Sequence, residues 1–94
     1  MFRVEWCELA QSRLADEWLK ADSRLCAAIT AVAHDIEQRL SRAPEKAGES
    51  REPGTRILIA RPLTVTFHAN VRTRIVLISG VSVHRRRPPG QQED

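Results

Sequence analysis

The stretch RILIARPLTVTFHANVRTRIVLISGVSV, residues 56–83, decides the fold. Between Leu63 and Ala69, apolar and polar side chains alternate, which is the period of a half-buried β-strand. Pro62 has no amide hydrogen to donate to a ladder, so it separates this strand from an earlier one over residues 56–61. Residues 74–83 form a third apolar segment. The sequence therefore predicts three consecutive strands joined by short connections.

The third of these strands has an apolar middle rather than an alternating one, because residues 75–78 read Ile-Val-Leu-Ile. A continuous apolar run is typical of a strand that is covered on both faces, so we expect this strand at the centre of the sheet. The turn before it falls within residues 70–73.

The N-terminal half predicts one strand followed by two helices. Residues 2–6 alternate between apolar and charged side chains. From residue 7 to residue 21, apolar side chains recur every three or four positions, as on one face of an α-helix. Asp22 and Ser23 favour the start of a second helix, which continues to about residue 42. A break this short predicts an antiparallel helical hairpin.

Between the hairpin and the strands lies a polar segment, residues 43–55, with two prolines and two glycines, which predicts a long loop. The predicted fold is therefore α+β, in the order βααβββ, with the N-terminal strand and the helical hairpin packed on a twisted antiparallel sheet. A single core is expected between hairpin and sheet. Its predicted members are Trp6, Leu14, Trp18, Ile29, Val32, Ile36, Leu40, Val65, Phe67 and Leu77.

The two cysteines, Cys7 and Cys26, each open one of the predicted helices. In an antiparallel hairpin they lie at opposite ends of the pair, too far apart for the Cα separation of about 5.5–6 Å that a disulfide needs. Both are expected to be reduced.

Charge divides the 94-residue chain into two unlike parts. Residues 1–55 carry 8 basic and 10 acidic residues, a net charge of −2, and residues 56–94 carry 7 basic and 2 acidic residues, a net charge of +5. No acidic residue occurs from Pro53 to Gln92. Charge of one sign on a sheet attracts polyanions or an acidic protein partner.

Several functional classes lack a sequence signal. The first residues have no apolar core of signal-peptide length, and no apolar run approaches about 18 residues, so we expect a cytoplasmic protein without membrane contact. His34, His68 and His84 have no cysteine or carboxylate at metal-ligand spacing. No glycine-rich phosphate loop occurs. We expect no metal and no cofactor.

The run His84-Arg85-Arg86-Arg87 follows the predicted central strand. Its functional reading is a phosphate or base contact, with His84 able to exchange a proton near neutral pH. The alternative is a charged tail that keeps the strand end soluble.

Two further groups of side chains are candidates for binding a partner or nucleic acid. Thr64, Thr66 and His68 share one face of their strand, where they either line a site or form an ordinary polar face in water. Arg51 and Arg56 lie in or beside the predicted loop, and either reach a ligand or close surface salt bridges, each of which contributes less than about 1 kcal/mol.

A family resemblance rests on six short segments in order along residues 2–87. They are Phe2-Arg3-Val4-Glu5-Trp6, Glu17-Trp18-Leu19, Leu40-Ser41-Arg42-Ala43-Pro44, Gly48-Glu49-Ser50-Arg51, Pro62-Leu63-Thr64-Val65-Thr66-Phe67 and Val81-Ser82-Val83-His84-Arg85. With these segments the chain resembles the RelE/ParE superfamily of toxins from bacterial type II toxin–antitoxin modules, which includes plasmid stabilisation proteins.

The resemblance implies a toxin domain over residues 1–87, and residues 88–94 are expected to be a disordered tail. It also implies a cognate antitoxin that lays a helix or strand over the toxin in a hetero-oligomer. RelE-like members cut mRNA in the ribosome without a metal, and ParE-like members poison DNA gyrase. Growth inhibition is the expected outcome of either activity.

The residues favour the ParE-like alternative. Thr64 stands where the nuclease branch often has an arginine, and the chain has no tyrosine. If the protein is a nuclease, the resemblance assigns catalysis to His84, Arg85 and Arg61. For partner or nucleic-acid binding, the candidates are Arg51, Arg56, Arg61, His68, Arg85 and Arg86. A weak ribosome-dependent endoribonuclease and an inactive protein-binding relative are the two remaining readings.

Overall fold

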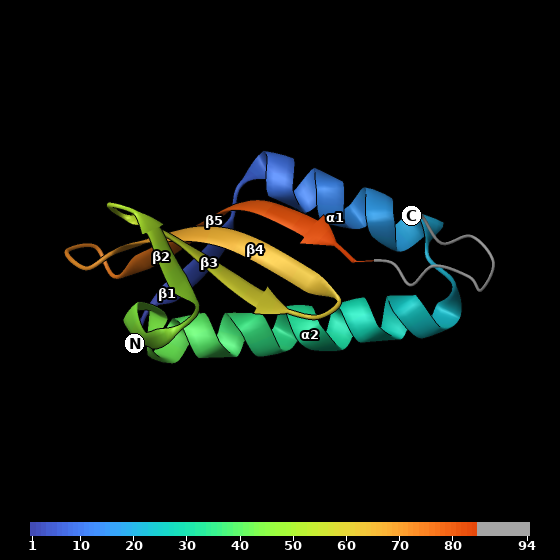
Figure 1. The fold of residues 1–94 in the computed structure, drawn as a ribbon, viewed down its shortest axis with the longest axis horizontal. Coiled ribbons are helices and arrows are strands. Elements are labelled where there is room, and N and C mark those ends of the chain that lie inside the picture. Colours follow the sequence, from blue (N-terminus) through green and yellow to red (C-terminus); the bar gives the residue numbers. More distant parts are fainter. Residues whose placement is uncertain (85–94) are drawn as a thin grey trace, which may run out of the picture.

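The computed structural model describes residues 1–84, which form five strands, two α-helices and one short 3-10 helix. Figure 1 shows the helices lying along the sheet, joined at the end of the molecule farthest from the N-terminus. The elements are β1 (Arg3–Trp6), α1 (Glu8–Lys20), α2 (Ser23–Arg42), η1 (Pro44–Lys46), β2 (Glu49–Glu52), β3 (Thr55–Ala60), β4 (Leu63–Asn70) and β5 (Ile75–Val83).

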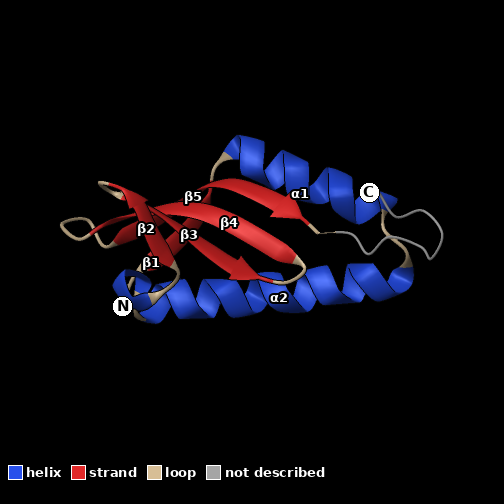
Figure 2. Cartoon of the chain, viewed as in Figure 1, coloured by secondary structure: helices blue, strands red, loops and turns tan. Residues whose placement is uncertain are grey.

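The five strands form one sheet in the order β1-β5-β4-β3-β2 (Figure 2). The pairs β2·β3, β3·β4 and β4·β5 are antiparallel, whereas β1 runs parallel to β5. The predicted α+β fold, the antiparallel helices and the three consecutive strands are confirmed. Because β2, β3, β4 and β5 alternate in direction, β1 runs in the same direction as β3 and β5 and opposite to β2 and β4.

The prediction of a structureless loop over residues 43–55 is wrong. This segment contains η1 and the edge strand β2, which pairs with β3 through main-chain hydrogen bonds. All four residues of β2 are exposed, so the strand has no apolar face that a sequence pattern could reveal. Gly48 and Gly54, at φ +66° and +85°, supply the left-handed backbone at the two ends of β2.

Only one face of the sheet is covered by the helices. The buried side chains of β4 alternate with exposed or half-buried ones, and those of β5 do the same. A β-bulge at Ser79 adds one residue to β5, since Phe67 pairs with Ile78 and Thr66 pairs with Gly80. Buried residues of β5 therefore stay opposite buried residues of β4 on both sides of the bulge. The buried apolar side chains are Ala10, Ile29, Ile36, Leu40, Leu58, Leu63, Val65, Phe67, Val76, Ile78 and Val81.

The predicted core is confirmed for five of its ten members, which are fully buried, and three more pack against them half-buried. It is wrong for Leu77, whose side chain is 39% exposed because the second face of β5 is uncovered. It is also wrong for Trp18, which is 44% exposed. The prediction that β5 is covered on both faces is wrong for the same reason, since none of residues 1–84 forms a layer over the face that carries Leu77.

Both cysteines are free thiols, and each has a local hydrogen-bonding role. The Cys7 sulfur accepts a hydrogen bond from the backbone N–H of Ala10 at 3.4 Å and so caps α1. The Cys26 thiol donates to the carbonyl of Trp18 at 3.1 Å, near the other end of α1. The 11 residues from Cys7 to Trp18 span about 16 Å of helix, which explains why the two sulfurs are not linked.

Candidate functional site

The uncovered side of the sheet, which we call the open face, is the broadest surface that the fold leaves without a layer of helices. It carries Thr64, Thr66 and His68 from β4, Ile57 and Ile59 from β3 and Leu77 from β5. Ile59 is 60% exposed there. The predicted polar stripe of β4 is therefore flanked by exposed apolar side chains, a mixture suited to contact with a macromolecule.

Three of the candidate residues lie at the end of the open face next to the β3–β4 turn, which we call the turn end. They are Arg61, Thr64 and His84. The Thr64 Oγ1 and the His84 Nε2 share a hydrogen bond at 2.6 Å. The backbone N–H of His84 donates to the carbonyl of Pro62 at 2.7 Å, which fixes the imidazole beside the β3–β4 turn. Arg61 lies in that turn and is exposed. A hydrogen-bonded imidazole and hydroxyl and an exposed arginine of the adjoining turn thus belong to the same end of the sheet.

The other end, the hairpin end, lies at the β2–β3 hairpin. Of the candidate residues, it holds Arg51 and His68 on the open face. Arg51 is exposed at the bulge of β2. The His68 Nδ1 hydrogen-bonds to the carbonyl of Gly54 in the hairpin turn. Four residues of extended strand, about 13 Å, separate His68 from Thr64. The structure therefore does not bring the candidate residues into a single cluster.

Arg56 differs from the other candidate residues because its side chain is directed to the covered side of the sheet. Its Nε donates to the carbonyl of Ala47 at 2.9 Å and its Nη2 donates to the carbonyl of Gly48 at 3.0 Å. These two bonds hold the connection between η1 and β2. Sequence reasoning missed this role, because nothing in the local sequence beyond the glycine at position 48 indicates that Arg56 bonds to the chain before β2.

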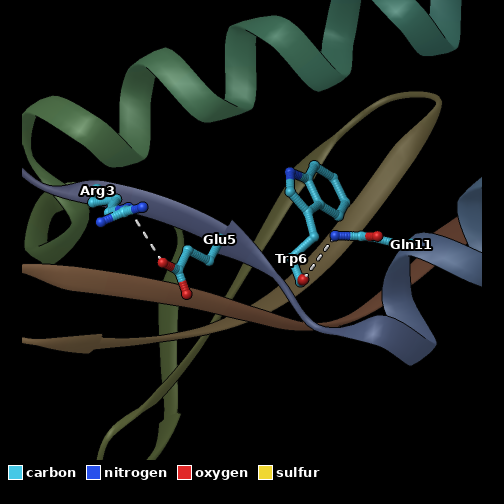
Figure 3. Close-up of polar contacts among 4 residues, drawn as sticks. All are labelled: Arg3, Glu5, Trp6 and Gln11. Carbon is cyan, nitrogen blue, oxygen red and sulfur yellow. Dashed lines mark hydrogen bonds and ion pairs between the residues drawn. The ribbon is translucent and has the colours of Figure 1, made fainter.

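The sequence predicted a sheet without acidic residues. This prediction is confirmed only for the three inner strands, β3, β4 and β5. The edge strand β1 adds Glu5 in register with Leu77, and the edge strand β2 adds Glu49 and Glu52 in register with β3. Glu5 forms an ion pair with Arg3 at 3.3 Å, shown in Figure 3. The basic residues of this part of the chain lie mostly in the turns that join the inner strands, with Arg61 between β3 and β4 and with Arg72 and Arg74 between β4 and β5.

Residues 1–84 lack the features of two further functional classes. Within this range, no helix combines the length and apolar character needed to span a bilayer. In the same range, no three histidine, cysteine or carboxylate side chains come close enough together to hold a metal ion. Arg85 and Arg86 lie outside the described residues, as does the predicted tail over residues 88–94.

The fold resembles that of solved toxin–antitoxin proteins over nearly the whole chain. The RelBE2 complex of Mycobacterium tuberculosis matches with a TM-score of 0.69 and 23% identity, covering 89% of this chain and 91% of that one. The chromosomal ParDE system of P. aeruginosa matches with a TM-score of 0.68 and 19% identity, covering 90% and 98%. The isolated E. coli RelE toxin matches with a TM-score of 0.62 and 14% identity, covering 93% and 88%.

By sequence, no family model and no curated protein matches the chain. The likeness is therefore one of structure, at 14–23% identity over these three matches. The arrangement of strands and helices in this protein is the fold of RelE- and ParE-type toxin–antitoxin proteins.

Proposed function

We propose that this protein is the toxin of a type II toxin–antitoxin pair, acts in the cytoplasm and is neutralised by a cognate antitoxin. Its activity is ParE-like: it inhibits growth by binding a large cellular target of the gyrase type. The observation that carries the proposal is the extent of the structural match, which includes an isolated RelE toxin and covers 93% of this chain. The open face, with its exposed Ile59 and Leu77, is the target-binding surface in this proposal.

The turn end supports binding over RNA cleavage. Cleaving RNA requires a base for the 2′-hydroxyl, charge stabilisation at phosphorus and a proton for the leaving oxygen. Among residues 1–84, this end offers His84, whose Nε2 is bonded to Thr64, and the single guanidinium of Arg61. Losing one charge-stabilising donor typically lowers a rate about 10²–10³-fold.

One observation favours the second candidate, a weak ribosome-dependent endoribonuclease. The backbone N–H of His84 donates to Pro62, the residue after Arg61, so both candidate catalytic residues belong to the same end of the sheet. For that activity, the family resemblance assigns Arg85 to catalysis as well.

Induced expression distinguishes the two candidates. We expect growth arrest with DNA damage and intact mRNA, relieved by co-expression of the cognate antitoxin. Messenger RNA cut at positions set by codons would replace the gyrase-type proposal with the nuclease. Normal growth at a verified level of folded protein would reject both.

Replacing Arg85 and Arg86 together with alanine should reduce growth inhibition. As binding groups in a buried contact, each contributes a charge-assisted hydrogen bond of about 1.5–3 kcal/mol. His84→Ala should have a much smaller effect, because binding requires no proton transfer. The matched control removes two arginines from α2, Arg24→Ala with Arg42→Ala, and should leave growth inhibition unchanged. The opposite pattern, with His84→Ala abolishing toxicity, would favour the nuclease.

The antitoxin should associate with the sheet at a rate that falls as salt rises. Long-range attraction between an acidic segment and the arginines in the turns of the inner strands accelerates encounter, and salt screens it. Stopped-flow mixing of the purified pair over a range of salt concentrations measures this rate. A rate independent of salt would show that charge on the sheet does not guide the encounter.

A further inference from the structure

A cavity between the two helices, separate from the open face, has the dimensions of a small-molecule site. The helices α1 and α2 diverge from their connection, as Figure 1 shows, and the cavity between them has a volume of about 660 Å³. Sites for small organic molecules usually measure about 300–1,000 Å³ and have mainly apolar and aromatic walls with a few polar groups. The apolar part of this lining includes Trp6, Leu14, Ala15, Trp18, Leu19 and Ile29.

The polar side chains of the lining hold both indoles of the protein in place. They are Gln11, Thr30, His34 and Glu37. The Trp6 Nε1 donates to Glu37 Oε2 at 2.7 Å, and the Trp18 Nε1 donates to Thr30 Oγ1 at 3.2 Å. Figure 3 shows the Trp6 side chain extending from its strand, while Gln11 donates to the Trp6 carbonyl at 3.1 Å. The aromatic walls of the cavity are therefore fixed by hydrogen bonds to both helices and not by apolar contact alone.

Glu37 is the acidic group of the lining, and its carboxylate is half-buried. The ion pairs formed within residues 1–84 involve Glu5, Asp16 and Asp35 and do not include Glu37. The Trp6 indole bonds to Oε2, and the second carboxylate oxygen can accept further hydrogen bonds. A half-buried carboxylate that accepts from a neutral indole is complementary to a positively charged donor, because hydrogen bonds between ionised groups are the strong ones.

The cavity has a charged end and an apolar end. Glu37 and Thr30 are seven residues apart on α2, which is about 10 Å along the helix. The carboxylate lies with Trp6 at one end, whereas Trp18 lies with Thr30 at the other. Leu19, next to Trp18 in sequence, is 76% exposed at the apolar end. A ligand that follows this axis has a cation at one end and a hydrocarbon body at the other.

We propose that this cavity binds a small amphiphilic amine, a primary ammonium group carried on a hydrocarbon chain. The ammonium pairs with the Glu37 carboxylate beside Trp6, whose indole face also attracts a cation. The hydrocarbon covers Leu14 and extends toward Trp18. A neutral or anionic ligand of the same shape would shield the carboxylate from water without giving it a partner of opposite charge, which is unfavourable. This binding activity uses a surface that the proposed toxin function does not require.

Three probes that share one hydrocarbon chain test the charge of the ligand: hexylamine, hexanol and hexanoate. Because the chain has two tryptophans and both line the cavity, indole emission of the full-length protein reports on its occupancy. Hexylamine should bind about 10-fold more tightly than hexanol, as expected for one charge-assisted hydrogen bond, and hexanoate should bind most weakly. Equal affinities for the three probes would show an apolar cavity without charge selectivity and would overturn the proposal, as would absence of hexylamine binding.

The hydrocarbon part of the ligand is tested with primary amines of increasing length, from butylamine to octylamine. Each added methylene should raise the affinity about two- to fourfold while the chain still lies inside the cavity, because it removes further apolar surface from water. An affinity independent of chain length would contradict the assignment of the hydrocarbon to the apolar end.

Variants at Glu37 test the carboxylate itself. Glu37→Gln keeps an oxygen that can accept from the Trp6 indole, and should weaken hexylamine about 10-fold while changing hexanol less than about twofold. Hexanol binding thus verifies that the cavity of the variant is intact. The matched control, Asp35→Asn, lies on the same helix outside the lining and should change hexylamine affinity less than about twofold, as expected for a screened surface charge. Undiminished hexylamine affinity in Glu37→Gln would overturn the proposal.

Discussion

Phe67→Ala is expected to destabilise the protein by about 3–5 kcal/mol, because truncating a buried phenylalanine removes its apolar contacts and leaves a cavity. Phe67 lies in β4, pairs with Arg56 on one side and Ile78 on the other, and is fully buried. A domain of this size unfolds with a free energy of about 5–15 kcal/mol, so the substitution removes a large share of the total. Growth inhibition should fall because less of the chain is folded.

Urea denaturation of purified protein measures this effect, as a lower midpoint with an unchanged slope. Two control substitutions should lower the stability much less than Phe67→Ala. Phe67→Leu keeps most of the buried volume and should cost less than about 1.5 kcal/mol. Ile59→Ala removes an apolar side chain that is 60% exposed, and should cost little. A loss below about 1 kcal/mol for Phe67→Ala would mean that β4 does not pack against the helices as described.

The alternation in β4 was readable from the sequence because one face of the strand is buried and the other is not. The same reasoning failed for β5, since apolar side chains on both faces do not tell whether a second layer exists. Leu77 is apolar and yet partly exposed on the open face. Helical periodicity likewise placed Trp18 on the apolar stripe of α1, but it could not show that the neighbouring helix is splayed away.

The strand β2 escaped prediction for a different physical reason. Its residues read Glu-Ser-Arg-Glu and none is buried, so its position is set by main-chain pairing with β3 and by the Arg56 side chain. Contacts of this kind join residues whose local sequence carries no pattern. The turn end is similar, because the bond from Thr64 to His84 depends on a register that includes the bulge at Ser79.

Gly48→Ala should be the most damaging substitution outside the core. The residue has φ +66°, where a side chain costs about 1–2 kcal/mol. A Cβ there would lie 2.1 Å from the Ile57 carbonyl oxygen and 2.7 Å from its carbon, both backbone atoms of β3. Forcing backbone apart costs about 1–3 kcal/mol more, which gives a total of about 2–5 kcal/mol.

Alanine substitutions at two other glycines serve as controls, with smaller expected losses of stability. Gly54→Ala shares the positive φ, at +85°, but its Cβ would meet only the movable ring of His68 at 3.0 Å, so about 1–2 kcal/mol is expected. Gly80→Ala would place a Cβ 3.6 Å from that of Thr66, an ordinary contact, and should be nearly neutral.

Denaturation curves rank the three variants, and hydrogen exchange locates the damage. For Gly48→Ala, amides of β2 and of the facing half of β3 should lose protection first, because a displaced Gly48 also breaks the bond that its carbonyl accepts from Arg56. Equal stability of the Gly48 and Gly80 variants would contradict the docking of η1 and β2 against β3. Arg51 and His68 would then no longer share one end of the sheet, and the hairpin end would not exist as a binding surface.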